Sequence, residues 1–170
     1  MLTFLNLEAE GFCSIESLHL QLNPTCTILI KAPNGKGKST ILSALVWAIY
    51  GKNLKGVSEV NTWKQVRPKD YKGTKVQVYF QKDSHTYKIV RCQKYDEVLE
   101  DGAKGKDRLI FMKDGDIVDI KGKGKIQDFI NREIGLSYTL FMNSIMFGQG
   151  IKRLIQESNS DKKKDIRRSI

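Results

Sequence analysis

The chain has 170 residues, of which 40% are hydrophobic, and a formal net charge of +10. This length is enough for one domain with a core, and no apolar run approaches the roughly 20 residues of a membrane-spanning helix. The three cysteines form no close pair and the two histidines are isolated, which argues against a disulfide framework or a zinc site and favours a cytoplasmic protein.

Two short strands and an apolar run open the chain. Apolar and polar residues alternate over residues 5–9 and again over residues 18–22, as in half-buried strands. Residues 26–30 are nearly all apolar and are expected to form a third, fully buried strand.

The next segment, residues 32–40, reads Ala-Pro-Asn-Gly-Lys-Gly-Lys-Ser-Thr. A strand, a glycine-rich loop ending in Gly-Lys-Ser-Thr and a helix are the context of a phosphate-binding P-loop. Gly35 and Gly37 allow successive backbone N–H groups to point at phosphate oxygens, Lys38 is expected to reach the β- and γ-phosphates, and Ser39 to ligate Mg²⁺. Ala32 replaces the usual first glycine, a small substitution where the loop starts. The sequence therefore predicts that the chain binds a nucleoside triphosphate.

Apolar residues at helical spacing over residues 41–50 predict a helix with one core face, ended by Gly51. Residues 52–73 are expected to form a surface loop. Strands are predicted at 76–80 and 87–92, joined by a hairpin, and at 108–112 and 117–120, joined by a turn at Asp114-Gly115. Residues 97–106 between them are expected to be a loop.

A short amphipathic helix is predicted around residues 126–133, and Ser137 is predicted to cap a helix over residues 138–143. A short apolar strand, residues 145–147, then leads to Gly148-Gln149-Gly150. The polar tail, residues 158–170, is expected to begin a coiled-coil helix.

The basic net charge indicates that the chain binds a polyanion, most often nucleic acid. The alternative is a solvated lysine-rich surface. Several lysines stand near glycines on expected loop or hairpin tips, where flexible side chains suit sequence-independent contacts with DNA phosphates. These candidate DNA-binding residues are Lys104, Lys106, Lys121, Lys123 and Lys125.

In its order of motifs the chain resembles the N-terminal half of the SMC-like DNA-repair ATPases, above all the SbcC type and the ATPase subunit of phage recombination endonucleases. The resemblance rests on the N-terminal strand pair, residues 34–40, the helix ending Trp47-Ala48-Ile49-Tyr50-Gly51-Lys52, and residues 141–150, which are similar to the family's Q-loop region. It implies an α/β fold, a P-loop NTPase of the ABC-ATPase type, with residues 1–157 as the N-terminal lobe and an antiparallel β subdomain.

The resemblance also implies roles for individual residues. Lys38 and Gln149 would be catalytic, and Ser39 and Gln149 would hold Mg²⁺. The triphosphate of ATP would be held by Asn34, Gly35, Lys36, Gly37, Lys38, Ser39 and Thr40. Ser14 would contact the nucleotide, and Cys13 stands where the family often has an arginine.

The sequence has no apolar strand ending in Asp-Glu, the Walker B element, and no Leu-Ser-Gly-Gly signature. In the family these belong to a C-terminal lobe that follows the coiled coil, so the chain is expected to be a fragment or one partner of a split ATPase. The implied partners are that lobe, a second head, a nuclease subunit and double-stranded DNA, without a membrane, in the cytoplasm with the DNA. ATP-driven closure of two heads would clamp DNA and regulate the nuclease.

Other interpretations remain open at this point. The chain could be another ABC-type DNA protein, such as a RecF-like or RecN-like repair ATPase or a true SMC protein. It could also be a catalytically inert basic module that binds ATP and DNA. A P-loop kinase would need lid arginines and an acceptor site, for which there is no cluster.

Overall fold

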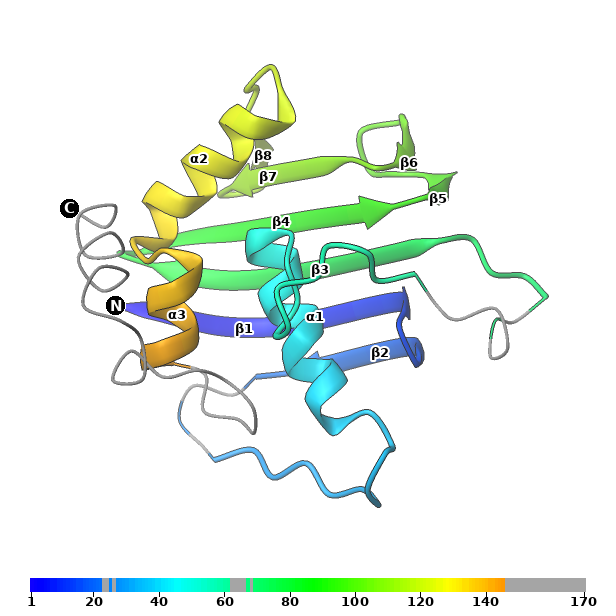
Figure 1. Cartoon of the computed structure of the whole chain (residues 1–170). Coiled ribbons are helices and arrows are strands. Elements are labelled where there is room, and N and C mark those ends of the chain that lie inside the picture. Colours follow the sequence, from blue (N-terminus) through cyan, green and yellow to red (C-terminus); the bar gives the residue numbers. More distant parts are fainter. Residues whose placement is uncertain (23–24, 26, 62–66, 68, 146–170) are drawn as a thin grey trace, which may run out of the picture.

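A computed structural model describes residues 1–22, 25, 27–61, 67 and 69–145 of the chain. The described residues form one large sheet, a small second sheet and three helices (Figure 1). The strands are β1 (Leu2–Phe12), β2 (Ile15–Gln21), β3 (Thr74–Lys82), β4 (His85–Gln93), β5 (Tyr95–Val98), β6 (Lys104–Lys106), β7 (Leu109–Lys113) and β8 (Asp116–Ile117). The helices are α1 (Lys38–Tyr50), α2 (Lys123–Ile134) and α3 (Tyr138–Ser144).

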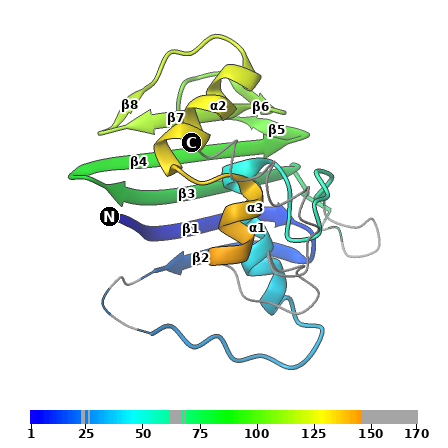
Figure 2. The same cartoon turned by 60° about the vertical axis from the view of Figure 1, so that its left-hand side comes forward.

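The large sheet has six strands in the order β2-β1-β3-β4-β7-β8, and every pair of neighbours is antiparallel. Three of the five neighbouring pairs, β1–β2, β3–β4 and β7–β8, are joined by tight hairpins, whereas β5 and β6 lie between β4 and β7 in the sequence. The strands β1 and β3 are far apart in sequence and pair over most of their length, with Leu7 opposite Val78. All three helices lie over the same face of this sheet, as the two views in Figures 1 and 2 show.

The main core lies between that face and the helices. Alternate residues of the central strands are fully buried there, including Leu7, Val78 and Phe80, and they pack against α1 and against Phe141 of α3. The ring of Phe80 stacks on Tyr87, with centroids 4.9 Å apart. Burial of this apolar surface is the main force that holds the helices on the sheet.

A buried arginine joins the end of α1 to the sheet and to α2. Arg91 of β4 donates from Nε to the Ala48 carbonyl at 2.9 Å and from Nη2 to the Ile49 carbonyl at 3.1 Å, and it also donates to Gln127 of α2. Burial lowers the pKa of Arg91 to about 9. The carbonyl end of the α1 dipole favours a cation there, so Arg91 helps to fix the axis of the helix whose other end carries the glycine-rich loop.

The opposite face of the sheet carries a second, smaller core. Val90, Cys92 and Ile110 pack there against Tyr95 and Leu99 of the β5–β6 region. The expectation of a loop over residues 97–106 is therefore wrong in part, because β5 and β6 pair with each other. Tyr95 and Leu99, which are buried, anchor this small sheet although most of its other residues are charged and exposed.

Most of the elements expected from sequence are confirmed. The alternating segments form β1, β2, β3 and β4, and Asp114 with Gly115 forms the turn between β7 and β8. Gly51 ends α1 in the left-handed conformation, with φ 71°, and its N–H donates to the Trp47 carbonyl at 2.8 Å. Ser137 caps α3 through its side chain, which accepts from the Leu140 N–H at 3.3 Å.

The prediction of a strand immediately before the P-loop is wrong. Residues 27–30 have no regular structure, and no other strand of the described chain pairs with them. Ile28 is 40% exposed and Leu29 is 72% exposed. An apolar run becomes a buried strand only when neighbouring strands cover it, and none is present among the described residues.

Ile145 is the C-cap residue of α3, and the rest of the expected strand at 145–147 lies outside the described residues. Gln149 and the expected helix over residues 158–170 lie outside them as well. Among the helices that are described, none has both the length and the apolar character that a bilayer crossing requires.

Candidate functional site: the glycine-rich loop and its neighbours

The N-terminus of α1 is arranged to receive an anion. Gly37 is the N-cap residue, with φ 83°, and no side chain caps the helix there. The first turn contains no acidic residue. Because the first N–H groups of a helix have no partner within it and carry the positive end of its dipole, this end of α1 suits a phosphate group.

The loop before the helix is closed by its own backbone and by Lys38. The Lys36 N–H donates to the Pro33 carbonyl at 3.3 Å, a turn that requires the positive φ of 78° at Gly35. The ammonium group of Lys38 donates to the carbonyls of Ala32 at 2.6 Å and Pro33 at 2.9 Å. An ammonium has three donors, so one N–H of Lys38 is left for a phosphate oxygen at the mouth of the loop.

The donor set also fits Mg²⁺ with a nucleotide. Ser39 lies in the first turn of α1 and is exposed, so its hydroxyl is free to face a ligand above the loop. Among the described residues, no group of three or more His, Cys, Asp or Glu side chains could hold a metal ion. Mg²⁺ binds proteins through one or two side-chain oxygens together with phosphate oxygens and water, so a single serine hydroxyl is an adequate first ligand.

The turn between β1 and β2 brings Ser14 beside the loop. Its Oγ lies 3.5 Å from the position that a Cβ on Gly37 would take. The two residues are far apart in sequence, and their proximity agrees with the predicted nucleotide contact of Ser14. The neighbouring Cys13 cannot replace a positively charged arginine, because a thiol has no cationic form, and burial raises its pKa and so disfavours the thiolate as well.

Sequence reasoning missed the segment that holds this turn. The Cys13 N–H donates to the Val60 carbonyl at 2.9 Å, and Phe12 forms a β-bridge with Asn61. Residues 52–73 were expected to be an irregular surface loop, yet Val60 is fully buried. The sequence did not single out Val60, because it is one of several apolar residues scattered through this polar stretch.

The expectation that the candidate DNA-binding lysines lie on loop or hairpin tips is wrong for most of them. Lys104 and Lys106 lie in β6, where Lys104 pairs with Asp96 at 3.5 Å. Lys121 lies in the bend before α2, whereas Lys123 and Lys125 belong to the first turn of α2. The sequence did not predict that Lys123 and Lys125 are helical, because Gly122 and Gly124 beside them have low helix propensity.

Lys123 is tied to the body of the protein. It donates to the Asp107 carbonyl at 2.8 Å, and burial together with the nearby Arg91 lowers its pKa. The N-terminus of α2 has no side-chain cap and no acidic residue in its first turn. The lysines therefore lie close to the positive end of a helix dipole. A bound anion would reduce the electrostatic repulsion between these positive charges.

Comparison with known proteins adds a family to this geometry. A family model described as an AAA domain matches residues 6–170. The DNA double-strand break repair Rad50 ATPase of Methanopyrus kandleri is 22% identical over 170 residues, which cover 96% of this chain and 18% of the relative. The probable DNA double-strand break repair Rad50 ATPase of Aquifex aeolicus is 28% identical over 161 residues, which cover 94% and 16%. The chain thus spans less than a fifth of the length of these relatives.

Solved structures agree on the fold. One solved structure, described as concerning ATP-driven dimerization and DNA-stimulated activation of SMC ATPases, matches with a TM-score of 0.57 at 20% identity. The match covers 97% of this chain and 98% of that one. A structure of the recombination mediator protein RecF with ATP matches with a TM-score of 0.50 at 19% identity, covering 74% and 30%. The predicted α/β class of P-loop ATPase and the predicted resemblance to SMC-like repair ATPases are both confirmed.

Proposed function

This chain belongs to the AAA domain family whose model matches residues 6–170, and on that premise we propose that it is the ATP-binding lobe of an SMC-like DNA-repair ATPase. The observation that carries the proposal is the uncapped N-terminus of α1, with Lys38 folded over a loop in which Gly35 and Gly37 have positive φ. This combination of free N–H groups, dipole and ammonium recognises a triphosphate.

In the proposed complex, Lys38 and those backbone N–H groups of residues 34–40 that have no partner within the loop or the helix bind the phosphates of ATP. Ser39 would hold Mg²⁺, and the ion would supply positive charge that offsets the charge of the phosphates. Ser14 adds a contact from the β1–β2 turn. Gln149, which lies outside the described residues, would be the second side-chain ligand of Mg²⁺ and would orient the attacking water.

Hydrolysis requires a second lobe in this proposal. The one Asp-Glu pair in the sequence, Asp96-Glu97, lies exposed in β5, so it does not act as the acidic end of a buried Walker B strand. The exposed apolar residues Ile28 and Leu29 lie just before the P-loop, and a strand from another lobe would cover them. A C-terminal lobe that carries Walker B and the signature loop would supply both that strand and the missing acid.

Double-stranded DNA is the proposed polyanion. The net charge of +10 favours phosphate contacts, and Lys121, Lys123 and Lys125 gather at the uncapped start of α2. Lys104 and Lys106 of β6 are the second proposed contact. Such contacts are independent of base sequence and weaken as salt increases.

The curated relatives are named as ATPases of DNA double-strand break repair, and this supports the wider setting of the proposal. Two heads would bind ATP between them, close on DNA and control a nuclease subunit in recombination, in the cytoplasm. The likeness to SMC and RecF structures keeps a chromosome or RecF-type role as the alternative within the same class.

The test is ATP turnover with and without linear duplex DNA. It is measured for this chain alone and after addition of a C-terminal lobe that carries Walker B and the signature loop. We expect turnover only with both lobes, an increase with DNA, and loss in Lys38→Ala. Lys36→Ala is the matched control, because Lys36 lies in the same loop, is exposed and is expected to add charge without catalysis.

Two outcomes would contradict the proposal. ATP binding without turnover in any pairing would favour an inert ATP-binding module. Equal loss in Lys36→Ala and Lys38→Ala would show that the loop acts only through its total charge.

A further inference from the structure

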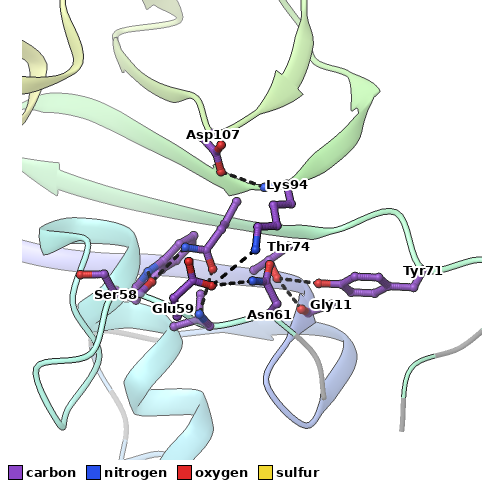
Figure 3. A network of polar contacts seen from close by, with 11 residues as sticks. Gly11, Ser58, Glu59, Asn61, Tyr71, Thr74, Lys94 and Asp107 are labelled. Carbon is purple, nitrogen blue, oxygen red and sulfur yellow. Dashed lines mark hydrogen bonds and ion pairs between the residues drawn. The ribbon is translucent and has the colours of Figure 1, made fainter. Parts of the chain in front are cut away.

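The β1–β2 turn is held from behind by residues 58–61, which we term the brace. The Val60 carbonyl accepts from the Cys13 N–H at 2.9 Å, and Asn61 bridges Phe12. In Figure 3, Asn61 of the brace lies beside Gly11, near the end of β1, and Glu59 and Ser58 follow farther from Gly11. Within the brace, the Asn61 amide donates to the Glu59 carboxylate at 2.8 Å.

Two side chains from regular elements fix the brace in turn. The indole Nε1–H of Trp47, on α1, donates to the Ser58 carbonyl at 3.0 Å. The Gln93 side chain, on β4, accepts from the Val60 N–H at 2.8 Å and donates to the same Ser58 carbonyl at 3.1 Å. A primary amide can do both because it has a donor and an acceptor end.

The brace therefore sets the position of Ser14 relative to the P-loop. Trp47 and the N-cap Gly37 belong to one rigid helix, so the brace is anchored to the same element that carries the phosphate site. Ser14 Oγ lies beside Gly37, within 3.5 Å of where its Cβ would be. A small displacement of the brace moves Ser14 away from a ligand on the loop.

We propose that Gln93 is a positioning residue for the nucleotide: it acts through the brace to hold Ser14 against the P-loop. The inference rests on the proposed function, because it assumes that ATP binds there. Gln93 does not itself need to touch the nucleotide.

Replacement Gln93→Leu tests this with little change in volume. It removes both hydrogen bonds of the amide and leaves the buried Val60 N–H without its acceptor, while the Trp47 bond to Ser58 remains. The matched control is Gln77→Leu, because Gln77 lies on the neighbouring strand β3 but donates to Glu8 on the opposite face of the sheet, at 2.7 Å.

Binding of ATP with Mg²⁺ is measured by isothermal titration calorimetry for the wild type, Gln93→Leu, Ser14→Ala and the double variant. Loss of one neutral hydrogen bond is expected to weaken binding about fivefold in Gln93→Leu and in Ser14→Ala. The double variant should bind no more weakly than either single variant, since both changes remove the same contact. Gln77→Leu should bind as the wild type does.

Additive effects of the two substitutions, or unchanged affinity in a folded Gln93→Leu, would overturn the inference. If Gln93→Leu does not fold, Trp47→Phe carries the same cycle with Ser14→Ala, since it deletes the donor to Ser58, together with part of the ring volume, and keeps an aromatic ring beside Phe12. Absence of ATP binding in the wild type would overturn the proposed function together with this inference. If the wild type binds ATP, Lys38→Ala loses the binding and Ser14→Ala binds as the wild type does, the inference is overturned and the proposed function stands.

Discussion

The close approach of β1 to the start of β3 gives a sharp test of the fold around the site. Gly11 has φ 60° and is buried beside Gly73. A Cβ added to Gly11 would lie 2.2 Å from the Gly73 carbonyl oxygen and 2.7 Å from the Tyr71 ring. We therefore expect Gly11→Ala to be strongly destabilising.

The expected cost has two parts. A side chain in the left-handed region costs about 1–2 kcal/mol, and forcing extra volume into a packed site costs about 1–3 kcal/mol more. The upper part of this range applies at Gly11, because the atom that a Cβ would strike belongs to the backbone. Gly102→Ala is the control: its φ is 75° and a Cβ there would meet nothing within 4 Å. That variant should lose only the conformational part.

The measurement is urea unfolding of the wild type and both variants, followed by circular dichroism, with free energies taken from the midpoints and slopes. Gly11→Ala should cost at least about 2 kcal/mol more than Gly102→Ala. Equal losses in the two variants would refute the close approach of these strands, because strain at positive φ alone would then explain both.

Two further predictions concern the two cores. Phe80 is fully buried and stacks on Tyr87, so Phe80→Ala should lower the free energy of unfolding by about 3–5 kcal/mol, and a loss below about 1 kcal/mol would contradict its place in the main core. Burial raises the pKa of Cys92 to about 12, so the folded chain keeps a thiol proton that the unfolded chain loses above about pH 8.5. The stability from this neutral thiol is complete below pH 8.5 and is lost as the pH rises toward 12, at about 1.4 kcal/mol per pH unit. Urea midpoints between pH 8 and 10 should fall less steeply in Cys92→Ala than in the wild type, and equal slopes would contradict burial of the thiol.

Features that depend on neighbouring residues were readable from the sequence alone. The P-loop needs Gly35, Gly37 and Lys38 within a few positions, so it can be read from adjacent residues, and it predicted the family and a helix after the loop. That helix, α1, begins at Lys38, earlier than the expected residue 41. Alternation of apolar residues identified β1 to β4, and Asp114-Gly115 identified a hairpin, but β5 and β6 were missed. These signals are local because backbone conformation and side-chain direction repeat over two to four residues.

Only the tertiary structure decided which segments meet. Alternation shows that a strand has a buried face but does not name its neighbour, so the pairing of β1 with β3 was not readable. The nucleotide contact of Ser14 was implied by the family resemblance alone, and the folded chain brings Ser14 beside Gly37. Residues 27–30 have the composition of a strand, yet they stay unpaired within the described chain because strand hydrogen bonds need a second segment. The brace was hidden for the same reason: Gln93 and Val60 are joined by a hydrogen bond across 33 positions, and only the folded sheet brings them within 2.8 Å.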